Sequence, residues 1–228
     1  MQKILAKVLS SAAVLAVFLF SAFSVCAAST SSCVKCHQGQ KQTQKLEHNY
    51  SDWKQSIHAA KGVTCESCHG GDAATSDPVK AHQGVLSSRD KNASIYFQNI
   101  PNTCGKCHSQ ELEQFKTSVH YKMLERSGKG PNCLTCHGAM ATTVLTAADL
   151  DQTCSLCHAK PTRAAKALKL MDSIKNALAH LKKTEKKSAA VKDFEMRYDE
   201  IKKEWHSFDI ADVTEKSMAL LKELQKNK

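Results

Sequence analysis

Five copies of the pattern C-x-x-C-H run along the chain. They lie at residues 33–37, 65–69, 104–108, 133–137 and 154–158, and are called the first to fifth motifs from here on. Two thiols separated by two residues can both add to the vinyl groups on one edge of a haem, and the histidine that follows then lies under the iron. The pattern therefore predicts five covalently bound haem c groups.

Ten of the eleven cysteines belong to these motifs, whereas a chain of this composition would contain roughly 0.02 such motifs by chance. The expected haem attachment residues are Cys33, Cys36, Cys65, Cys68, Cys104, Cys107, Cys133, Cys136, Cys154 and Cys157. The expected proximal ligands of the haem irons are His37, His69, His108, His137 and His158.

Three other uses of paired cysteines fit the pattern less well. Structural zinc sites take four ligands, and five cysteine pairs do not divide evenly into Cys₄ sites. A thioredoxin-like dithiol would occur once, beside a βαβ pattern that this sequence lacks. The bacterial ferredoxin run C-x₂-C-x₂-C-x₃-C-P is also missing.

Six histidines lie outside the motifs, while five irons each need a sixth ligand. His58 and His120 occur in the similar segments WKQSIHAA and FKTSVHYK, each with an aromatic residue and a serine at the same positions before the histidine. We expect both on short helices that point across at a neighbouring haem.

The four other candidate distal ligands have less repetitive contexts. They are His82 in VKAHQG, His206 in EWHSFD, His180 in the middle of a helical stretch, and His48 in the polar segment LEHNY. Five of the six spare histidines suffice for five irons, so which one is not a ligand stays open. Methionine ligation by Met123 or Met140 is an alternative without a repeated context.

The first 28 residues have the pattern of a cleaved secretory signal peptide. Lys3 and Lys7 precede an uncharged run that ends in SVCAAS, whose small residues suit cleavage after Ala27 or Ala28. The alternatives are an uncleaved membrane anchor and lipidation at Cys26. Export agrees with haem attachment, and the expected location is the periplasm, the cell surface or the exterior.

The net charge of the polypeptide alone differs from the net charge expected for the haem-loaded protein. The chain has 32 Lys+Arg and 22 Asp+Glu, a formal net charge of +10. Five haems would bring about ten propionate charges and move the holoprotein close to neutrality, so we expect no nucleic-acid binding.

The composition divides the chain into a signal peptide at 1–28, a pentahaem domain at 29–161 and a helical segment at 162–228. The pentahaem domain is too poor in aromatic and long apolar stretches to build its own core. Its expected fold is mainly α, with few short helices and many loops packed around the haems.

The last segment has no cysteine or glycine and carries apolar residues at helical spacing. The pattern predicts amphipathic helices at 162–186, 188–207 and 212–226, with Asp209 or Asp212 as an N-cap. If His180 and His206 reach haems, these helices dock on the haem-packed part.

Residues 50–160 resemble the multihaem cytochromes c of the nitrite reductase, hydroxylamine oxidoreductase and tetrahaem cytochrome superfamily. The similarity rests on W-x-x-S-x-H…V-T-C-x-x-C-H-G, H-G-G-D…A-H and T-C-G-x-C-H…F-x-x-S-x-H. It implies bis-histidine haems in stacked and perpendicular pairs, and an electron-transfer role. It also implies that the motif histidines are proximal ligands and that His58, His120 and His82 are distal ligands.

Saturated irons favour an electron carrier without substrate chemistry, and two imidazoles with anionic propionates favour the ferric state and low potentials. The alternatives are a pentahaem nitrite or hydroxylamine-type reductase and a membrane-anchored quinol-oxidising subunit; a haem-based sensor or a scaffold comes after them. In that reductase family the catalytic haem usually has a motif ending in Lys, whereas all five motifs here end in His. The expected partners are redox proteins, with a membrane quinol dehydrogenase, a terminal reductase and a homo-oligomer as open options.

Overall fold

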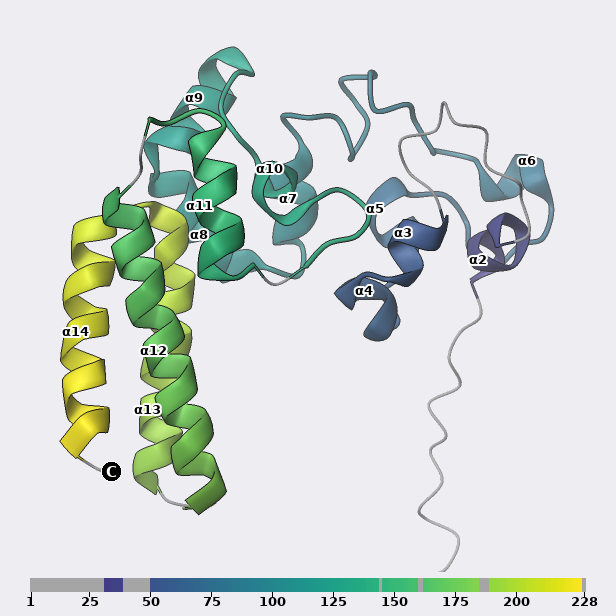
Figure 1. The fold of residues 1–228 in the computed structure, drawn as a ribbon. Coiled ribbons are helices and arrows are strands. Elements are labelled where there is room, and N and C mark those ends of the chain that lie inside the picture. The colour runs from purple at the N-terminus through teal and green to yellow at the C-terminus, as the bar shows by residue number, and fades with distance from the viewer. Residues whose placement is uncertain (1–30, 39–49, 144, 160–161, 185–188, 227–228) are drawn as a thin grey trace, which may run out of the picture. The chain divides into compact units, whose positions relative to one another are not determined.

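The computed structural model describes residues 31–38, 50–143, 145–159, 162–184 and 189–226, and these residues form helices and loops without a strand. Residues Ser31–Lys228 form one compact unit. Figure 1 shows short helices in the first part of this unit and long helices at its C-terminal end. The mainly α fold predicted from the sequence is confirmed. The predicted signal peptide, and His48, lie outside the described residues.

The part of the chain that contains the motifs forms helices of four to nine residues. They are α2 (Ser32–His37), α3 (Tyr50–Lys54), α4 (Ile57–Ala60), α5 (Glu66–His69), α6 (Pro78–Ala81), α7 (Ile100–Gly105), α8 (Ser109–Thr117), α9 (Val119–Ser127), α10 (Cys133–His137) and α11 (Ala147–Ser155). Each motif lies in a short helix or at the end of one.

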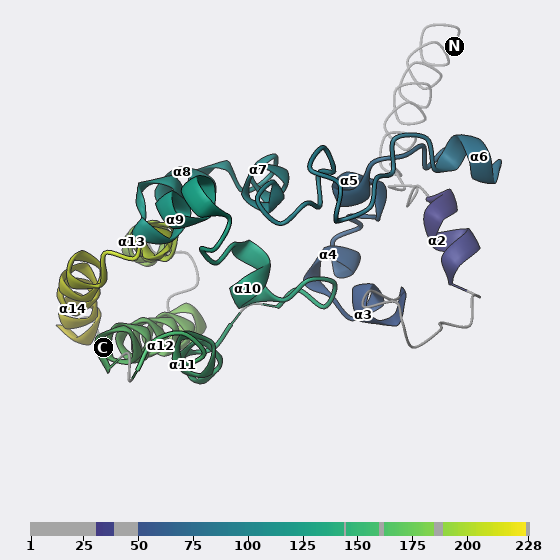
Figure 2. The same cartoon turned by 90° about the horizontal axis from the view of Figure 1, so that it is seen from above.

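The C-terminal segment forms α12 (Thr162–Thr184), α13 (Ala189–Glu204), the 3₁₀ turn η1 (Trp205–Ser207) and α14 (Ile210–Lys226). The three long helices contact one another and lie side by side in both ribbon views (Figure 1, Figure 2). The bounds agree with the predicted helices to within two or three residues. Asp209 is the N-cap of α14, since its Oδ1 accepts a hydrogen bond from the Asp212 N–H at 3.1 Å.

Apolar side chains at helical spacing hold these three helices together. The buried cluster consists of Ala167, Leu168, Met171, Ile174, Ala177, Leu178, Leu181, Val191, Phe194, Ile201, Trp205, Val213, Leu220 and Leu224. Because these positions recur every three or four residues, each helix turns one apolar stripe inward. The predicted helical spacing of apolar residues is confirmed, and Tyr198 and Leu221 pack at the edge of the cluster, partly exposed.

The motif-bearing part has very little apolar interior of its own. Among the described residues before α12, the buried hydrophobic side chains are Ala93, Ile100, Phe115 and Leu124. So small a set cannot offset the conformational entropy of so many ordered residues. This agrees with the expectation that haem supplies the packing surface of this part.

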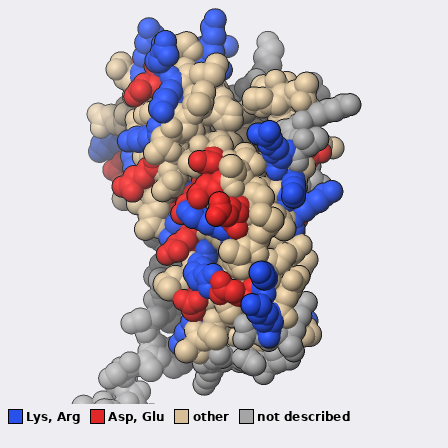
Figure 3. All heavy atoms as spheres, turned by 90° about the vertical axis from the view of Figure 1, so that its left-hand side faces the viewer, with Lys and Arg blue, Asp and Glu red and all other residues tan. Residues whose placement is uncertain are grey.

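Charged side chains cover the outer face of the C-terminal helices. Figure 3 shows Lys and Arg interspersed with Asp and Glu on this face. Arg197 of α13 binds both carboxylate oxygens of Glu223 of α14 at 2.7 and 2.9 Å, and Lys216 binds Glu204 at 2.8 Å. In the described ranges, no helix is long and apolar enough to cross a membrane.

We predict that Leu220→Ala lowers the free energy of unfolding by about 2–5 kcal/mol, because Leu220 is only 1% exposed in the cluster. Urea unfolding followed by far-UV circular dichroism measures the change. The control is Met196→Ala, since Met196 is 58% exposed on α13 and its loss should change the free energy by less than about 0.5 kcal/mol. Equal effects of the two variants would contradict the assignment of this core.

Candidate haem-binding sites

Each motif forms one helical turn that gathers its three reactive side chains. In the second, third and fifth motifs, the histidine N–H donates to the carbonyl of the first cysteine at 2.9–3.0 Å. Residues at i, i+3 and i+4 of such a turn lie on the same face. The two thiols and the imidazole therefore project to the same side, as attachment to one haem requires. None of the ten motif cysteines, all of them in the described ranges, forms a disulfide.

Four of the five motif histidines face a second histidine ring from another part of the chain. The ring centroids are 6.0 Å apart for His37 and His82, 6.2 Å for His108 and His58, 5.9 Å for His158 and His120, and 6.3 Å for His137 and His206. In every pair the second ring is one of the spare histidines singled out in the sequence.

This separation has a simple chemical meaning. A metal–imidazole bond is about 2.0 Å long, and the ring centre lies about 1.1 Å beyond the bonding nitrogen. Two imidazoles on opposite sides of one iron therefore have centres about 6 Å apart. The four observed separations fit a single iron between each pair of rings.

Hydrogen bonds at Nδ1 orient several of these rings for ligation through Nε2. Nδ1 of His82 donates to the Pro78 carbonyl at 2.7 Å, and Nδ1 of His206 donates to the Lys202 carbonyl at 3.1 Å. A carbonyl can only accept, so Nδ1 carries the hydrogen. The lone pair is then on Nε2, the nitrogen that remains available to bind iron.

Burial favours the neutral form of three of the spare histidines, and this is the form that can bind iron. The pKa of His58 is lowered by burial and then by the nearby His108, and the pKa of His120 is lowered by burial and then by His158. Burial is also the largest cause of the lowered pKa of His206. Neutral imidazole is the ligand form, because protonation removes the lone pair.

In the repeated S-x-H context, the serine is the N-cap of the helix that carries the histidine. The Ser56 hydroxyl accepts from the Ala59 N–H at 3.1 Å, and the Ser118 hydroxyl accepts from the Tyr121 N–H at 3.1 Å. Both serines are N-caps and are 2% exposed. Each cap starts a helix, α4 or α9, with the histidine at its second position. The short helices expected for these two histidines are therefore present.

The H-G-G-D…A-H context brings His82 close to the second motif. The Asp72 N–H donates to the Ala81 carbonyl at 3.0 Å, so the chain after the motif runs against the end of α6. Gly71 has a φ of 89°, and a Cβ there would overlap the Ala81 carbonyl oxygen. A glycine is needed at this position both for its left-handed backbone and for the close approach.

The remaining candidates are placed differently. His180 is exposed on α12 and borders a hollow with Ser173 and Leu221, and the structure does not bring it to a motif. His48 lies outside the described residues. His69 of the second motif lines a cavity with Tyr50, which follows His48 by two positions.

Three cavities are bounded by the predicted haem-binding residues. One, of about 630 Å³, lies between the first and second motifs and also takes His82 and Met140. A second, of about 270 Å³, lies between the third and fourth motifs beside His58. A third, of about 610 Å³, lies beside the fifth motif with His120 and Met123. Each combines thiols, imidazoles and apolar walls, as a haem pocket requires.

The thiols show which motifs are neighbours in the first half of the series. The pKa of Cys65 in the second motif is raised by burial and then by Cys33 of the first motif. The pKa of Cys68 is raised by burial and then by Cys104, with Cys107 adding to the rise. The second motif therefore lies between the first and the third.

The second half of the series continues in the same order. The thiols of Cys104 and Cys133 are hydrogen-bonded, which is the largest cause of the raised pKa of Cys104. Burial, then Cys154 and Cys157, raise the pKa of Cys136 to about 11. The five motifs thus follow one another in space in the order of the chain.

Two residues near the sites were not identified from the sequence. The Thr142 hydroxyl lies 2.8 Å from Nδ1 of His58, although 84 residues separate them. Asn132 is 2% exposed, caps α10 and donates to the Phe97 carbonyl at 2.8 Å, which anchors the fourth motif. The contacts of Thr142 with His58 and of Asn132 with Phe97 have no local sequence signal, since each joins segments distant in the chain. The capping role of Asn132 does have one, because an asparagine directly before a helix with a threonine three residues later is a capping pattern.

Comparison with known proteins adds independent support for haem binding. The family model for cytochrome c552 matches residues 40–132. Multiheme cytochrome MtrA of Shewanella baltica (strain OS185) is 25% identical over 130 residues, which are 57% of this chain and 32% of that protein. The chain is a multihaem c-type cytochrome. The finer superfamily predicted from the sequence stays a prediction.

A second relative covers a smaller part of the cytochrome. C-type polyheme cytochrome OmcC of Geobacter sulfurreducens (strain ATCC 51573 / DSM 12127 / PCA) is 29% identical over 90 residues, which are 40% of this chain and 11% of that protein. The matched regions thus span about a third and about a tenth of these two curated relatives. No solved structure matches the cytochrome.

We predict that Gly71→Ala converts one low-spin haem to high-spin, because the added methyl group pushes α6 away and moves His82 from its partner ring. The electronic absorption and EPR spectra of the purified holoprotein measure this change. Gly62→Ala is the matched control, since Gly62 also has a positive φ, of 74°, but a Cβ there would meet no atom within 4 Å. An identical spectrum for Gly71→Ala and the unmodified protein would contradict the assignment of His82.

We predict that Thr142→Val raises the midpoint potential of one haem. The hydroxyl accepts from His58 Nδ1 when Nε2 binds iron, and losing this acceptor makes His58 a weaker donor to ferric iron. A hydrogen bond is worth on the order of 1 kcal/mol, or on the order of 40 mV for a one-electron couple. Potentiometric titration measures the shift.

Two further variants separate this effect from a general disturbance. Thr142→Ser should restore the original potential, because it keeps the hydroxyl. Thr143→Val changes the adjacent side chain and should leave the potentials unaltered, since it is the Thr143 carbonyl that contacts His137, at 3.2 Å. A shift caused equally by Thr143→Val would refute the role of the Thr142 hydroxyl.

Proposed function

We propose that this chain is an exported pentahaem cytochrome that carries electrons through five bis-histidine haems arranged in chain order. The observation that carries the proposal is the set of four motif histidines, each facing a second histidine ring at 5.9–6.3 Å. Two protein ligands on one iron leave no coordination position for a substrate. Haem c, when bound, supplies a one-electron couple at each site.

The ligand set follows from the ring pairs. His82, His58, His206 and His120 are the distal ligands for the first, third, fourth and fifth motifs. For the second motif the distal ligand is His48. It precedes Tyr50 by only two positions in the chain, and Tyr50 lines the same cavity as His69. His180 is the spare histidine, since it is exposed on α12 away from the cavities beside the motifs.

The order of the motifs supports a relay and not a set of isolated centres. Neighbouring motifs share cavities or have thiols close enough to influence each other. Electrons can then enter near one end of the series and leave near the other. Two imidazoles per iron favour the ferric state, so we propose low potentials that overlap through mutual repulsion of the added electrons.

The cellular role is proposed from the predicted signal peptide and from the relatives. Export places the protein in the periplasm, at the cell surface or outside the cell. The two curated relatives are named as multihaem or polyhaem cytochromes, which supports redox proteins as the donor and the acceptor. A membrane quinol dehydrogenase and a terminal reductase are the partner classes that suit such a carrier.

A reductase is the second candidate function, because the family match is to cytochrome c552 and the resemblance includes nitrite reductases. That activity needs an iron with one exchangeable ligand position. All five motifs end in histidine, and four of these histidines face a second imidazole. These features favour the carrier.

Carbon monoxide binding to the reduced holoprotein tests the choice. We expect no appreciable binding and no turnover of nitrite or hydroxylamine with a viologen donor, while the protein accepts electrons from the viologen and passes them to an electrode. His206→Ala is the positive control, since it should open one iron and allow one carbon monoxide to bind per chain. Intact-mass spectrometry of the same sample should show five haems on the chain from about residue 28 or 29.

Two results would overturn the proposal. Fast carbon monoxide binding at one haem of the unmodified protein, together with nitrite or hydroxylamine turnover, would make it a reductase. A mass corresponding to fewer than five covalent haems would refute the pentahaem assignment.

A further inference from the structure

Nδ1 of His120 differs from the corresponding nitrogen of the other paired spare histidines. His58 has the Thr142 hydroxyl at 2.8 Å, His82 has the Pro78 carbonyl at 2.7 Å, and His206 has the Lys202 and Lys203 carbonyls at 3.1 Å. Nδ1 of His120 is buried, and it has no hydrogen-bond partner in the described part of the chain. A buried polar atom without a partner is unusual and calls for a physical reason.

An aromatic ring packs against the His120 ring. The Phe208 ring lies edge-on to the His120 ring, with centroids 4.4 Å apart and planes at 80°. Phe208 also contacts Phe115 and Trp205, at centroid distances of 6.3 and 6.4 Å. These contacts fix its ring between α8, η1 and the distal histidine.

The backbone of Phe208 is in an unfavourable conformation. Its φ of 59° and ψ of 22° are left-handed, and among the described residues no other residue except glycine has a positive φ. Asn or Gly normally occupies such a position, since a bulky side chain there is strained. Such backbone strain persists only where the surrounding structure imposes it. The ring contacts of Phe208 are what this conformation secures.

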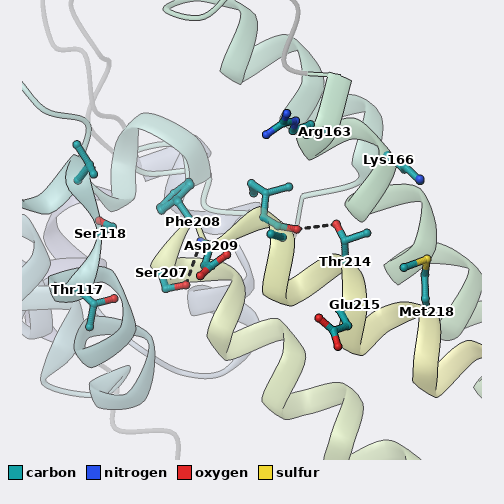
Figure 4. Close-up of a pocket in the computed structure, with 13 residues that line it drawn as sticks. Thr117, Ser118, Arg163, Lys166, Ser207, Phe208, Asp209, Thr214, Glu215 and Met218 are labelled. Carbon is teal, nitrogen blue, oxygen red and sulfur yellow. Dashed lines mark hydrogen bonds between the residues drawn. The ribbon is translucent and has the colours of Figure 1, made fainter.

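The location also explains why an aromatic residue can shield His120. Phe208 forms part of the wall of a cavity of about 1090 Å³ between α12 and the start of α14, as Figure 4 shows. It also lines the cavity that contains His120 and His158. The Phe208 ring is therefore part of the boundary between the cavity that contains His120 and the cavity that Lys166 lines.

We propose that Phe208 is the positioning residue for His120, and that its ring contact takes the place of the hydrogen bond that holds the other distal ligands. The inference rests on the proposed ligation of the fifth-motif haem by His120. Without an acceptor at Nδ1, His120 gives less electron density to iron than a hydrogen-bonded histidine would. The ferrous state of this haem is therefore favoured relative to a version in which Nδ1 donates a hydrogen bond.

Phe208→Asn tests the proposal directly. Asparagine accepts the left-handed backbone and brings a carbonyl oxygen that can accept from Nδ1. In an EPR-monitored potentiometric titration of the holoprotein, we expect the midpoint potential of one low-spin haem to fall. The expected shift corresponds to about a tenfold change in the ferric-to-ferrous ratio at fixed potential, which is about 59 mV for one electron.

Two companion variants make the result specific. Phe208→Leu keeps an apolar side chain without a ring or an acceptor, so the EPR signal of the same haem should broaden while its potential does not fall. Met196→Asn introduces the same asparagine at a site 58% exposed on α13 that lines none of the three haem-site cavities, and should alter neither the EPR signals nor the potentials. A fall in potential with Phe208→Leu as large as that with Phe208→Asn would overturn the proposal.

His120→Ala separates failure of this inference from failure of the ligand assignment. If His120→Ala leaves every haem low-spin, His120 is not a ligand, and both the assignment and the role of Phe208 are wrong. If one haem becomes high-spin but the two Phe208 variants leave that haem's signal and potential unaltered, the ligand assignment stands and only the role of Phe208 is overturned.

Discussion

The rest of the structure depends on one constraint, which is that imidazole rings from separate stretches of chain face each other in pairs. The first imidazole is local, because the motif turn sets it beside the thiols. The second comes from elsewhere: His58 precedes the second motif yet faces the third, and His82 precedes the third motif yet faces the first. These crossed pairs tie the loops together where the described residues before α12 offer few buried apolar side chains.

Around this constraint, ordinary local devices place each ring. Buried serine caps begin the helices that carry His58 and His120, and a glycine with a left-handed backbone lets the chain pass the end of α6 beside His82. The C-terminal helices form a conventional apolar core, and the turn that follows α13 delivers His206 to the fourth motif. The three C-terminal helices thus form their own core and also place a histidine ring beside the fourth motif.

The sequence predicted most features that depend on neighbouring residues, and few of the contacts between segments that are distant in the chain. The motifs, the helical stripes and the S-x-H contexts could be read because their signals lie within a few residues. The pairing of His58 with the third motif, the hydroxyl of Thr142 and the ring of Phe208 could not, because each depends on contacts between distant segments. His180 is exposed on α12 although core leucines flank it in the sequence, since neighbouring positions of a helix point in different directions.

The position of His206 ties the geometry beside the fourth motif to the C-terminal helices. The ring that faces His137 lies in the turn between α13 and α14, and both helices belong to the apolar cluster. A shift of α13 against α14 would therefore move His206 relative to His137. The packing of helices distant in the sequence thus sets the separation of the two rings at this motif.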